Sequence, residues 1–455
     1  MNNNTEKARS SFSGKIGFVL AAAGSAVGLG NIWRFPYLAA KYGGGIFLLT
    51  YIVLAITFGF TLMVTEIALG RKTRLSAIGA YGALDKRWSF LGTLSSLVPM
   101  IIFPYYCVIG GWVTKYLVSF LDGQNVLAAS DGYFESFISH PYMPIVWFTL
   151  FVAVTAVIVL MGVEKGIESA SKIMMPILVV LSAGIAIYTC MMPGAIEGIK
   201  YYLIPDFSKF SPMLVLAALG QLFYSMSLSM GIMITYGSYM KKDVNLENSV
   251  HQIGCFDTGI ALIAGLMIVP AFFVFSGGQT STMNAGAGLM FITLPKIFVN
   301  MPFGGALGTL FFLLVLFAAL TSSISLMETI VSILRDKLKW NRKLTCGIVV
   351  LGSLAIGIPS SLGYGPWAGF RPMGMSILDF FDFLSNSVLM PVIALLTSIF
   401  VGYFIKTKVI SEEVKISSKF YLEKLYVVMI KYVAPICIVA ILISSIMNSL
   451  GLIKI

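Results

Sequence analysis

The chain has 455 residues, of which 58% are hydrophobic and only 11% charged, and its mean hydropathy is +0.90. Soluble domains carry about 25% charged residues, so this composition excludes a water-soluble protein. The apolar runs continue for about 20 residues or more and do not alternate with period two, which also excludes an outer-membrane barrel. The composition therefore predicts an all-α polytopic membrane protein.

The apolar runs predict eleven membrane spans. In chain order they cover 15–39, 44–69, 89–120, 143–162, 169–191, 212–239, 253–275, 304–334, 343–361, 375–404 and 428–450. A shorter apolar segment at 283–300, interrupted by glycine and proline, is expected to form an extracellular loop helix.

The net charge of +11 is distributed unevenly along the chain. Most Lys and Arg residues fall in the N-terminal tail and in the loops after even-numbered spans, which is the positive-inside pattern. The N-terminus (1–14) is therefore expected in the cytoplasm and the C-terminus outside, in a plasma (inner) membrane. This pattern explains the positive net charge, so no nucleic-acid partner is expected. His140 and His251 are the only histidines, and no metal or triad spacing surrounds them, which argues against an enzyme.

The first span contains residues that a membrane helix rarely tolerates together. The stretch AAAGSAVGLGNIWRFP includes Gly24, Gly28 and Gly30, together with Asn31 and Arg34. A glycine inside a helix costs about 0.5–1 kcal/mol relative to alanine, and an arginine at membrane depth costs more. Small residues often mark close helix packing, which is the alternative interpretation. The density of helix breakers favours an interrupted helix.

The sixth span has a similar interruption, LGQLFYSMSLSMGIMITYGSY, with alternating serines followed by Gly231. It lies five spans after the first. This spacing predicts two inverted five-helix repeats, 15–192 and 211–405, followed by a separate last span at 428–450. Interrupted helices in matching positions of two repeats indicate a binding site near the membrane midplane. Their free ends offer N–H and C=O groups that suit an anion and a cation.

Several motifs carry a resemblance to a known family. They are GSAVGLGNIWRFP, KYGGGIFLLTY, EIALGR, PYYCVIGGW, GQLFYSMSLSMG and FAALTSSIS, in an order that holds from Arg9 to Asp382. The chain resembles the neurotransmitter:sodium symporter family of LeuT type, in particular its bacterial eleven-helix amino-acid transporters. The resemblance implies a LeuT-type fold with helices 1 and 6 unwound in mid-membrane. It also implies sodium-coupled import by alternating access, by a monomer or weak dimer in the lipid bilayer.

The resemblance implies two sodium sites, and both sets are rich in the hard oxygen ligands that such cations prefer. The first would use Ala26, Asn31, Ser225 and Asp257. The second would use Gly24, Val27, Ala318, Thr321 and Ser322. The alternative for Thr321 and Ser322 is back-bonding to their own helix.

An amino-acid substrate is implied as well. Its carboxylate would meet the amides of Leu29 and Gly30, the Tyr106 phenol and the first sodium ion. The remaining contacts would come from Ala26, Ile102, Tyr224, Ser227, Met230, Ser322 and Leu326. No acid lies between Glu6 and Glu66, where carriers of simple amines keep an aspartate. Methionine adapts its shape, so Met230 favours large hydrophobic or aromatic amino acids. Glycine or GABA, a non-transporting sensor and an ion channel are the alternatives.

Asp257 departs from the family pattern, because the family often has asparagine at this position. A fixed acid there could replace the chloride ion that other members need, which predicts chloride-independent transport, with proton counter-movement as a further expectation. The alternative is a carboxyl group held neutral or paired inside the bundle. Glu66 is expected to be structural, bonded to backbone in the first break.

The resemblance also implies gates. The outer gate would use Arg34, Asp382 and Gln221, with Tyr106 and Tyr224 as an aromatic lid. The inner gate would use Arg9, Asp336, Tyr239 and Phe12, although Arg9 also fits an ordinary positive-inside charge. Gly166 and Pro176 in the fifth span would let its cytoplasmic end unwind, and the alternative for Pro176 is a plain kink.

Overall fold

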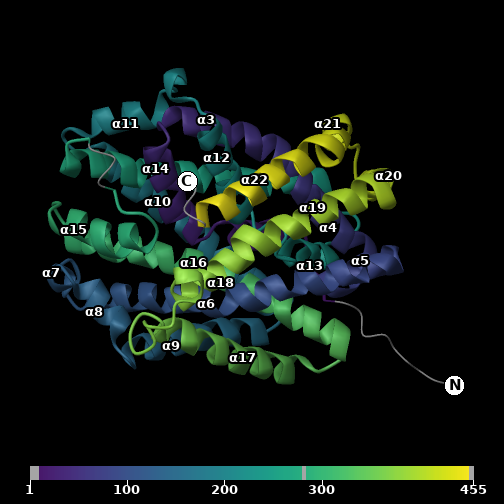
Figure 1. Ribbon diagram of the computed structural model, residues 1–455, viewed down its shortest axis with the longest axis horizontal. Coiled ribbons are helices and arrows are strands. Elements are labelled where there is room, and N and C mark those ends of the chain that lie inside the picture. The colour runs from purple at the N-terminus through teal and green to yellow at the C-terminus, as the bar shows by residue number, and fades with distance from the viewer. Residues whose placement is uncertain (1–9, 279–282, 450–455) are drawn as a thin grey trace.

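A computed structural model of the chain describes residues 10–278 and 283–449. Within these ranges the regular elements are helices, apart from one isolated bridge between Gly44 and Pro205. Figure 1 shows the long helices side by side, with the short helices α7 (Asn125–Ala128), α8 (Tyr133–Ser139) and α11 (Ala195–Leu203) at one end. At the other end lie α5 (Ala77–Leu84) and α20 (Lys408–Lys415). The all-helical fold class is confirmed.

Nine helical segments in the described ranges are long and apolar enough to cross a membrane, or ten if one bent pair counts as a span. The nine are Gly45–Thr73 (ending in α4), Lys86–Leu121 (mostly α6), Met143–Leu160 (α9), Val163–Cys190 (η4 and α10), Leu246–Ser276 (α14), Gly304–Leu338 (α16), Arg342–Leu362 (α17), Ile377–Phe404 (from α18, Ile377–Asp382, to η10, Phe400–Phe404) and Glu423–Asn448 (from α21, Glu423–Val428, into α22, Ala434–Ser449). The count of eleven and the division into two repeats stay predictions. The apolar segment at 283–300 contains a short helix, Leu289–Val299.

The bent pair is the first span. Its first half, α1 (Lys15–Ala26), ends where Val27 adopts extended backbone angles, and helix resumes at Gly30 in η1 (Gly30–Arg34) and α2 (Phe35–Lys41). The two halves meet at 55°. We call residues 27–29 the first break. The carbonyls that end α1 are freed from intrahelical bonding, as at any helix C-terminus.

The sixth expected span is also divided, into α12 (Pro212–Ser225) and α13 (Ile232–Tyr239). We call residues 226–231 between them the second break. Ser227, Ser229 and Gly231 have φ values of 52°, 61° and 72°. Left-handed backbone angles cost a non-glycine residue free energy, so tertiary contacts must hold the two serines in place.

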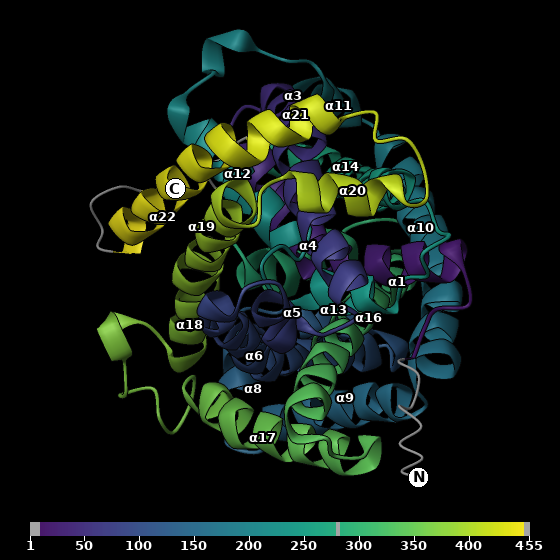
Figure 2. The ribbon, with the colours of Figure 1, turned by 90° about the vertical axis from the view of Figure 1, so that its right-hand side faces the viewer.

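Helix α13 packs tightly against α4 (Phe60–Thr73), near the centre of the end-on view in Figure 2. The contact is reciprocal. A Cβ atom on Gly70 would lie 1.8 Å from the Ile234 carbonyl oxygen, and one on Gly237 would lie 2.3 Å from that of Ile67. Only glycine permits backbones to approach this closely. The contact therefore joins α13 to α4 as one unit.

Replacing either Gly70 or Gly237 with alanine is expected to destabilise the protein by about 1–3 kcal/mol, because the new methyl group meets backbone that cannot move aside. The unfolding temperature of the detergent-purified protein measures this effect. Gly259→Ala in α14 is the control, since its added Cβ would meet nothing within 4 Å. Equal unfolding temperatures for all three variants would contradict the close-packing explanation.

Candidate functional site

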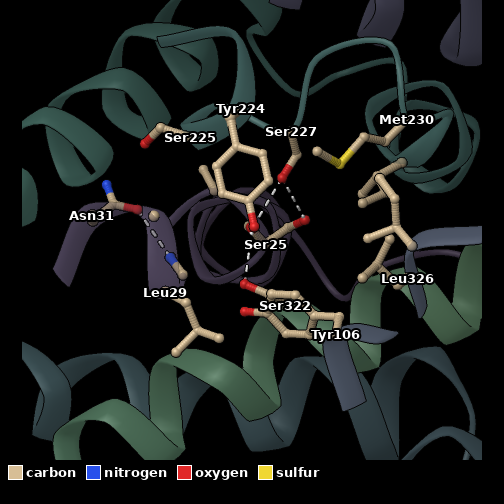
Figure 3. Close-up of a pocket in the computed structure, with 15 residues that line it drawn as sticks. Ser25, Leu29, Asn31, Tyr106, Tyr224, Ser225, Ser227, Met230, Ser322 and Leu326 are labelled. Carbon is tan, nitrogen blue, oxygen red and sulfur yellow. Dashed lines mark hydrogen bonds between the residues drawn. The ribbon is translucent and has the colours of Figure 1, made fainter. Parts of the chain in front are cut away.

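One cavity lies where the two breaks face α6 (Ser89–Leu121) and α16 (Gly304–Leu338), as Figure 3 shows. All ten residues expected to bind substrate line it, namely Ala26, Leu29, Gly30, Ile102, Tyr106, Tyr224, Ser227, Met230, Ser322 and Leu326. Ser25, Gly28, Asn31, Ser225 and Ile232 complete the lining. The structure thus brings together residues from four separate segments of the chain.

The part of the cavity beside the first break is polar and narrow. A Cβ atom on Gly28 would lie 2.8 Å from Ser322 Oγ and 3.2 Å from the Tyr106 hydroxyl, so glycine keeps this space open. The Tyr106 hydroxyl is buried, with Ser322 and the Leu29 amide nearby, yet no described atom meets it in hydrogen-bond geometry. A buried hydroxyl without a partner is costly, so this oxygen is suited to meet a ligand.

The opposite part of the cavity is apolar. Met230, Ile232, Ile102 and Leu326 come from the second break, α13, α6 and α16. One serine hydroxyl joins the second break to the end of α1: Ser227 Oγ donates to the Ser25 carbonyl at 3.0 Å. The cavity therefore offers hydrogen-bonding groups at one end and adaptable apolar side chains at the other, as small-molecule sites commonly do.

Asp257 of α14 is the centre of a buried polar cluster. Its Oδ1 atom accepts from Asn31 Nδ2 at 2.7 Å and from Ser225 Oγ at 2.6 Å. Its Oδ2 atom accepts from the Tyr51 hydroxyl at 3.2 Å. Asn31 Oδ1 in turn accepts from the Gly28 amide at 3.0 Å, which links the cluster to the first break. Three of the four residues expected at the first sodium site are thus in direct contact, and the fourth, Ala26, lines the adjoining cavity.

The residues expected at the second sodium site also meet. Ser322 Oγ lies 3.5 Å from the Gly24 carbonyl oxygen and 3.4 Å from that of Val27. Thr321 Oγ1 back-bonds to Phe317 at 3.0 Å and to Ala318 at 3.1 Å, which is the alternative considered for it. Ser322 instead turns its hydroxyl toward the end of α1 and the first break, and its nearest acceptor is the Ser25 carbonyl at 3.2 Å. Carbonyl and hydroxyl oxygens therefore cluster here, and they suit a hard monovalent cation.

Two of the expected outer-gate residues, Arg34 and Asp382, line a cavity of about 490 Å³ that shares Tyr224 with the site; Gln221 does not line it. Arg34 lies over the Tyr224 ring, with 5.7 Å between Cζ and the ring centroid. Asp382 accepts from the Tyr105 hydroxyl at 3.1 Å and from Asn386 Nδ2 at 2.6 Å. No ion pair joins Arg34 to Asp382 among the described residues. Gln221 Nε2 donates to the Gly30 carbonyl at 3.0 Å, deeper in the bundle.

Of the expected inner-gate residues, Arg9 lies outside the described residues. Phe12 is buried against the rings of Phe18, Tyr236 and Tyr239, and its amide donates to the Tyr239 carbonyl at 3.2 Å. Asp336 accepts from the Ser76 amide at 2.8 Å.

Beside the expected inner-gate residue Tyr239 lies an ion pair that the sequence analysis missed. The Tyr239 hydroxyl donates to Glu328 at 2.8 Å, and Arg342 forms an ion pair with the same carboxylate. Glu328 follows the FAALTSSIS motif on α16 by one helical turn, which was its only sequence signal.

Two expectations about neighbouring residues need correction or refinement. Glu66 bonds the second break rather than the first, because its Oε1 atom accepts from the Ser229 amide at 2.6 Å. This bond helps hold Ser229 in its left-handed conformation. Gly166 in η4 (Val163–Glu168) packs against the end of α9, since a Cβ atom there would lie 2.1 Å from the Ile158 carbonyl oxygen. Pro176 lies inside α10 (Ser169–Cys190).

Comparison with known proteins agrees with this architecture. A model of the sodium:neurotransmitter symporter family matches residues 9–136 and 125–452. An uncharacterized sodium-dependent transporter of Haemophilus influenzae is 35% identical, with 96% of this chain and 98% of the relative covered. The sodium-dependent transporter YhdH of Bacillus subtilis is 36% identical, with 96% and 97% covered.

A solved structure gives the same result for the fold. The crystal structure of MhsT in complex with L-phenylalanine matches with a TM-score of 0.86 and 37% sequence identity, over 96% of this chain and 100% of that one. The LeuT-type fold is therefore confirmed. Because the family comprises sodium-dependent symporters, the chain is a multi-pass membrane transporter and not an enzyme. The chain belongs to the sodium:neurotransmitter symporter family.

Proposed function

We propose that this transporter imports large hydrophobic or aromatic amino acids with sodium, without needing chloride, across the plasma (inner) membrane. The cavity between the two breaks carries this proposal. Its polar end provides backbone amides and the unpartnered Tyr106 hydroxyl for an α-carboxylate. Its other end provides Met230, Ile102, Ile232 and Leu326 for an apolar side chain. The phenylalanine bound to MhsT has this same division into a charged and an aromatic part.

Sodium is the second cargo in this proposal, with two sites. Asn31, Ser225, Asp257 and the Ala26 carbonyl would hold one ion beside the substrate carboxylate. The carbonyls of Gly24, Val27 and Ala318, with Thr321 and Ser322, would hold the other between α1 and α16. Ions at these places would order the first break against two other helices. Inward sodium movement would then supply about 2.3 kcal/mol per charge per 100 mV of membrane potential.

Binding to the purified protein tests the proposal. Labelled phenylalanine, tryptophan, tyrosine and leucine would be measured in sodium against potassium, each with chloride or gluconate. Sodium-dependent, chloride-independent binding of at least one is the expected result. Binding only of glycine or GABA would replace the substrate class and keep the transporter. Sodium-dependent binding without uptake into proteoliposomes would indicate a sensor, and sodium flux without a fixed substrate ratio would indicate a channel.

Replacing Pro176 with alanine is expected to slow turnover several-fold while leaving sodium-dependent binding intact. Proline removes one backbone donor, so alanine restores a hydrogen bond and stiffens the cytoplasmic end of the fifth span. Uptake rate and equilibrium binding in the same proteoliposomes separate the two effects. Pro359→Ala, inside α17, is the control for loss of a helix proline. Unchanged turnover in Pro176→Ala would indicate that this proline only bends the helix and has no role in unwinding.

A further inference from the structure

The fifth span, η4 and α10, lies along α1, and two pairs of residues mark the contact. A Cβ atom on Gly17 would lie 2.2 Å from the Glu168 carboxyl carbon, and one on Gly24 would lie 3.4 Å from Met175 Sδ. The two pairs lie seven positions apart along both segments, from Gly17 to Gly24 and from Glu168 to Met175, which is two helical turns. Glycines in α1 thus allow the fifth span to rest directly on the helix that ends at the first break.

Met175 covers the place where the second sodium site is proposed. Its side chain is fully buried and rests on Gly24, whose carbonyl points toward Ser322. The next residue is Pro176, which cannot donate a hydrogen bond back to Lys172. The helix therefore lacks one backbone hydrogen bond in the turn that contains Met175. The turn that contains Glu168 and Lys172 is joined to the rest of α10 less firmly than an ordinary helical turn.

Glu168 fastens the N-terminal segment to this weakened turn. The carboxylate is 1% exposed, accepts from the Ser13 amide at 2.8 Å and also accepts from the Ser13 hydroxyl. It forms an ion pair with Lys172 at 2.7 Å. From the other side, Lys241 donates to the Ser13 carbonyl at 2.8 Å, and the Phe12 amide donates to Tyr239. Ser13 is therefore held between the fifth span and the end of α13.

We propose that Glu168 is a positioning residue that couples the N-terminal segment to the fifth span, so that release of Ser13 and withdrawal of Met175 from the second sodium site occur together. This inference rests on the proposed function, because it assigns a role in sodium release. Charge-assisted hydrogen bonds to a buried carboxylate are strong enough to couple two segments. Loss of the carboxylate would free both segments at once and populate the inward-open state.

Hydrogen–deuterium exchange on the full-length protein in detergent, with and without sodium chloride, tests the coupling. In the wild type, sodium is expected to slow exchange in 13–20 and in 163–175 together. In Glu168→Gln both segments are expected to exchange about fivefold faster or more in sodium. Glu164→Gln is the matched control, because Glu164 is an exposed acid in the same helical turn. Faster exchange in only one of the two segments of Glu168→Gln would overturn the proposal.

Sodium titration of amino-acid binding gives a second readout that a purely structural role would not move. A smaller population of the sodium-competent state raises the half-saturating sodium concentration in inverse proportion. Glu168→Gln is expected to raise it about fivefold or more with unchanged maximal binding, and an unchanged value would overturn the proposal.

Ser13→Ala, which removes one hydroxyl, keeps the test valid if Glu168→Gln does not fold, and it should shift exchange in both segments in the same direction. Exchange that is unchanged in both segments of Ser13→Ala would count against the coupling. If the wild type bound no amino acid, the proposed substrate would fail, while exchange in sodium alone would still decide the coupling.

Discussion

Replacing Asp257 with asparagine is expected to make sodium-driven uptake depend on chloride. Three donors converge on this carboxylate, from Asn31, Ser225 and Tyr51. The substitution keeps the size of the side chain and removes its charge, so the sodium ion proposed beside it loses a fixed negative partner. The attraction between two opposite unit charges about 4 Å apart contributes about 4 kcal/mol at an effective dielectric constant of 20. The hydroxyl donors that remain could instead bind a halide.

Uptake in proteoliposomes with chloride or gluconate outside measures this effect. We expect Asp257→Asn to lose uptake by about tenfold or more in gluconate and to recover part of it in chloride. Asp243→Asn, at an exposed acid in the loop before α14, should behave like the wild type in both media. If Asp257→Asn took up substrate equally well in both media, the carboxylate would have no role in charge balance. Loss of wild-type uptake in gluconate would exclude chloride independence altogether.

The two breaks could be predicted because their residues interrupt an apolar background. Glycine, serine and asparagine in the first and sixth spans conflict with continuous helices, and the structure interrupts both helices at these places. The signal is local, so it needs no knowledge of tertiary contacts. The convergence of the ten pocket residues followed from the resemblance, and the structure brings them around one cavity.

Partners that depend on tertiary contact were not predictable in the same way. Tyr51, Tyr105 and Tyr116 all lie in apolar runs of the sequence. The first two donate to the carboxylates of Asp257 and Asp382, whereas Tyr116 donates to the Phe291 carbonyl. The residues around each tyrosine in the sequence do not distinguish these roles. The partner of Glu66 was misplaced for a related reason. Both breaks offer free amides, and only the packing of α4 against α13 selects Ser229.

Span boundaries show the limit of hydropathy. The seventh span was expected to begin at 253, but α14 begins at Leu246, where the Asn245 side chain accepts from the Asn248 amide at 2.9 Å. Asn248, His251 and Gln252 are polar, so hydropathy alone places the start of the span too late. A capped helix can continue past the apolar region as long as its backbone bonds are satisfied. The fifth span also begins before its expected start at 169: helix starts at Val163 and runs through charged residues such as Glu164, here without a side-chain cap at Gly162.

Replacing Tyr106 with phenylalanine is expected to weaken substrate binding by about tenfold or more without lowering the stability of the substrate-free protein. The hydroxyl is buried and meets no described partner, so the free protein loses no hydrogen bond with it. In the complex it would donate to the substrate carboxylate, and hydrogen bonds to charged groups contribute about 1.5–3 kcal/mol. Equilibrium binding and unfolding temperature therefore move independently in this variant.

Tyr202→Phe supplies the opposite case. Tyr202 lies in α11 and does not line the cavity; its side chain is buried and its hydroxyl donates to the Leu262 carbonyl at 3.0 Å. Removing it leaves that carbonyl without this partner, so stability should fall by about 1 kcal/mol while substrate affinity stays unchanged. If Tyr106→Phe instead lost stability and kept affinity, its hydroxyl would serve the protein interior. The substrate carboxylate would then have to be bound by the first-break amides and sodium alone.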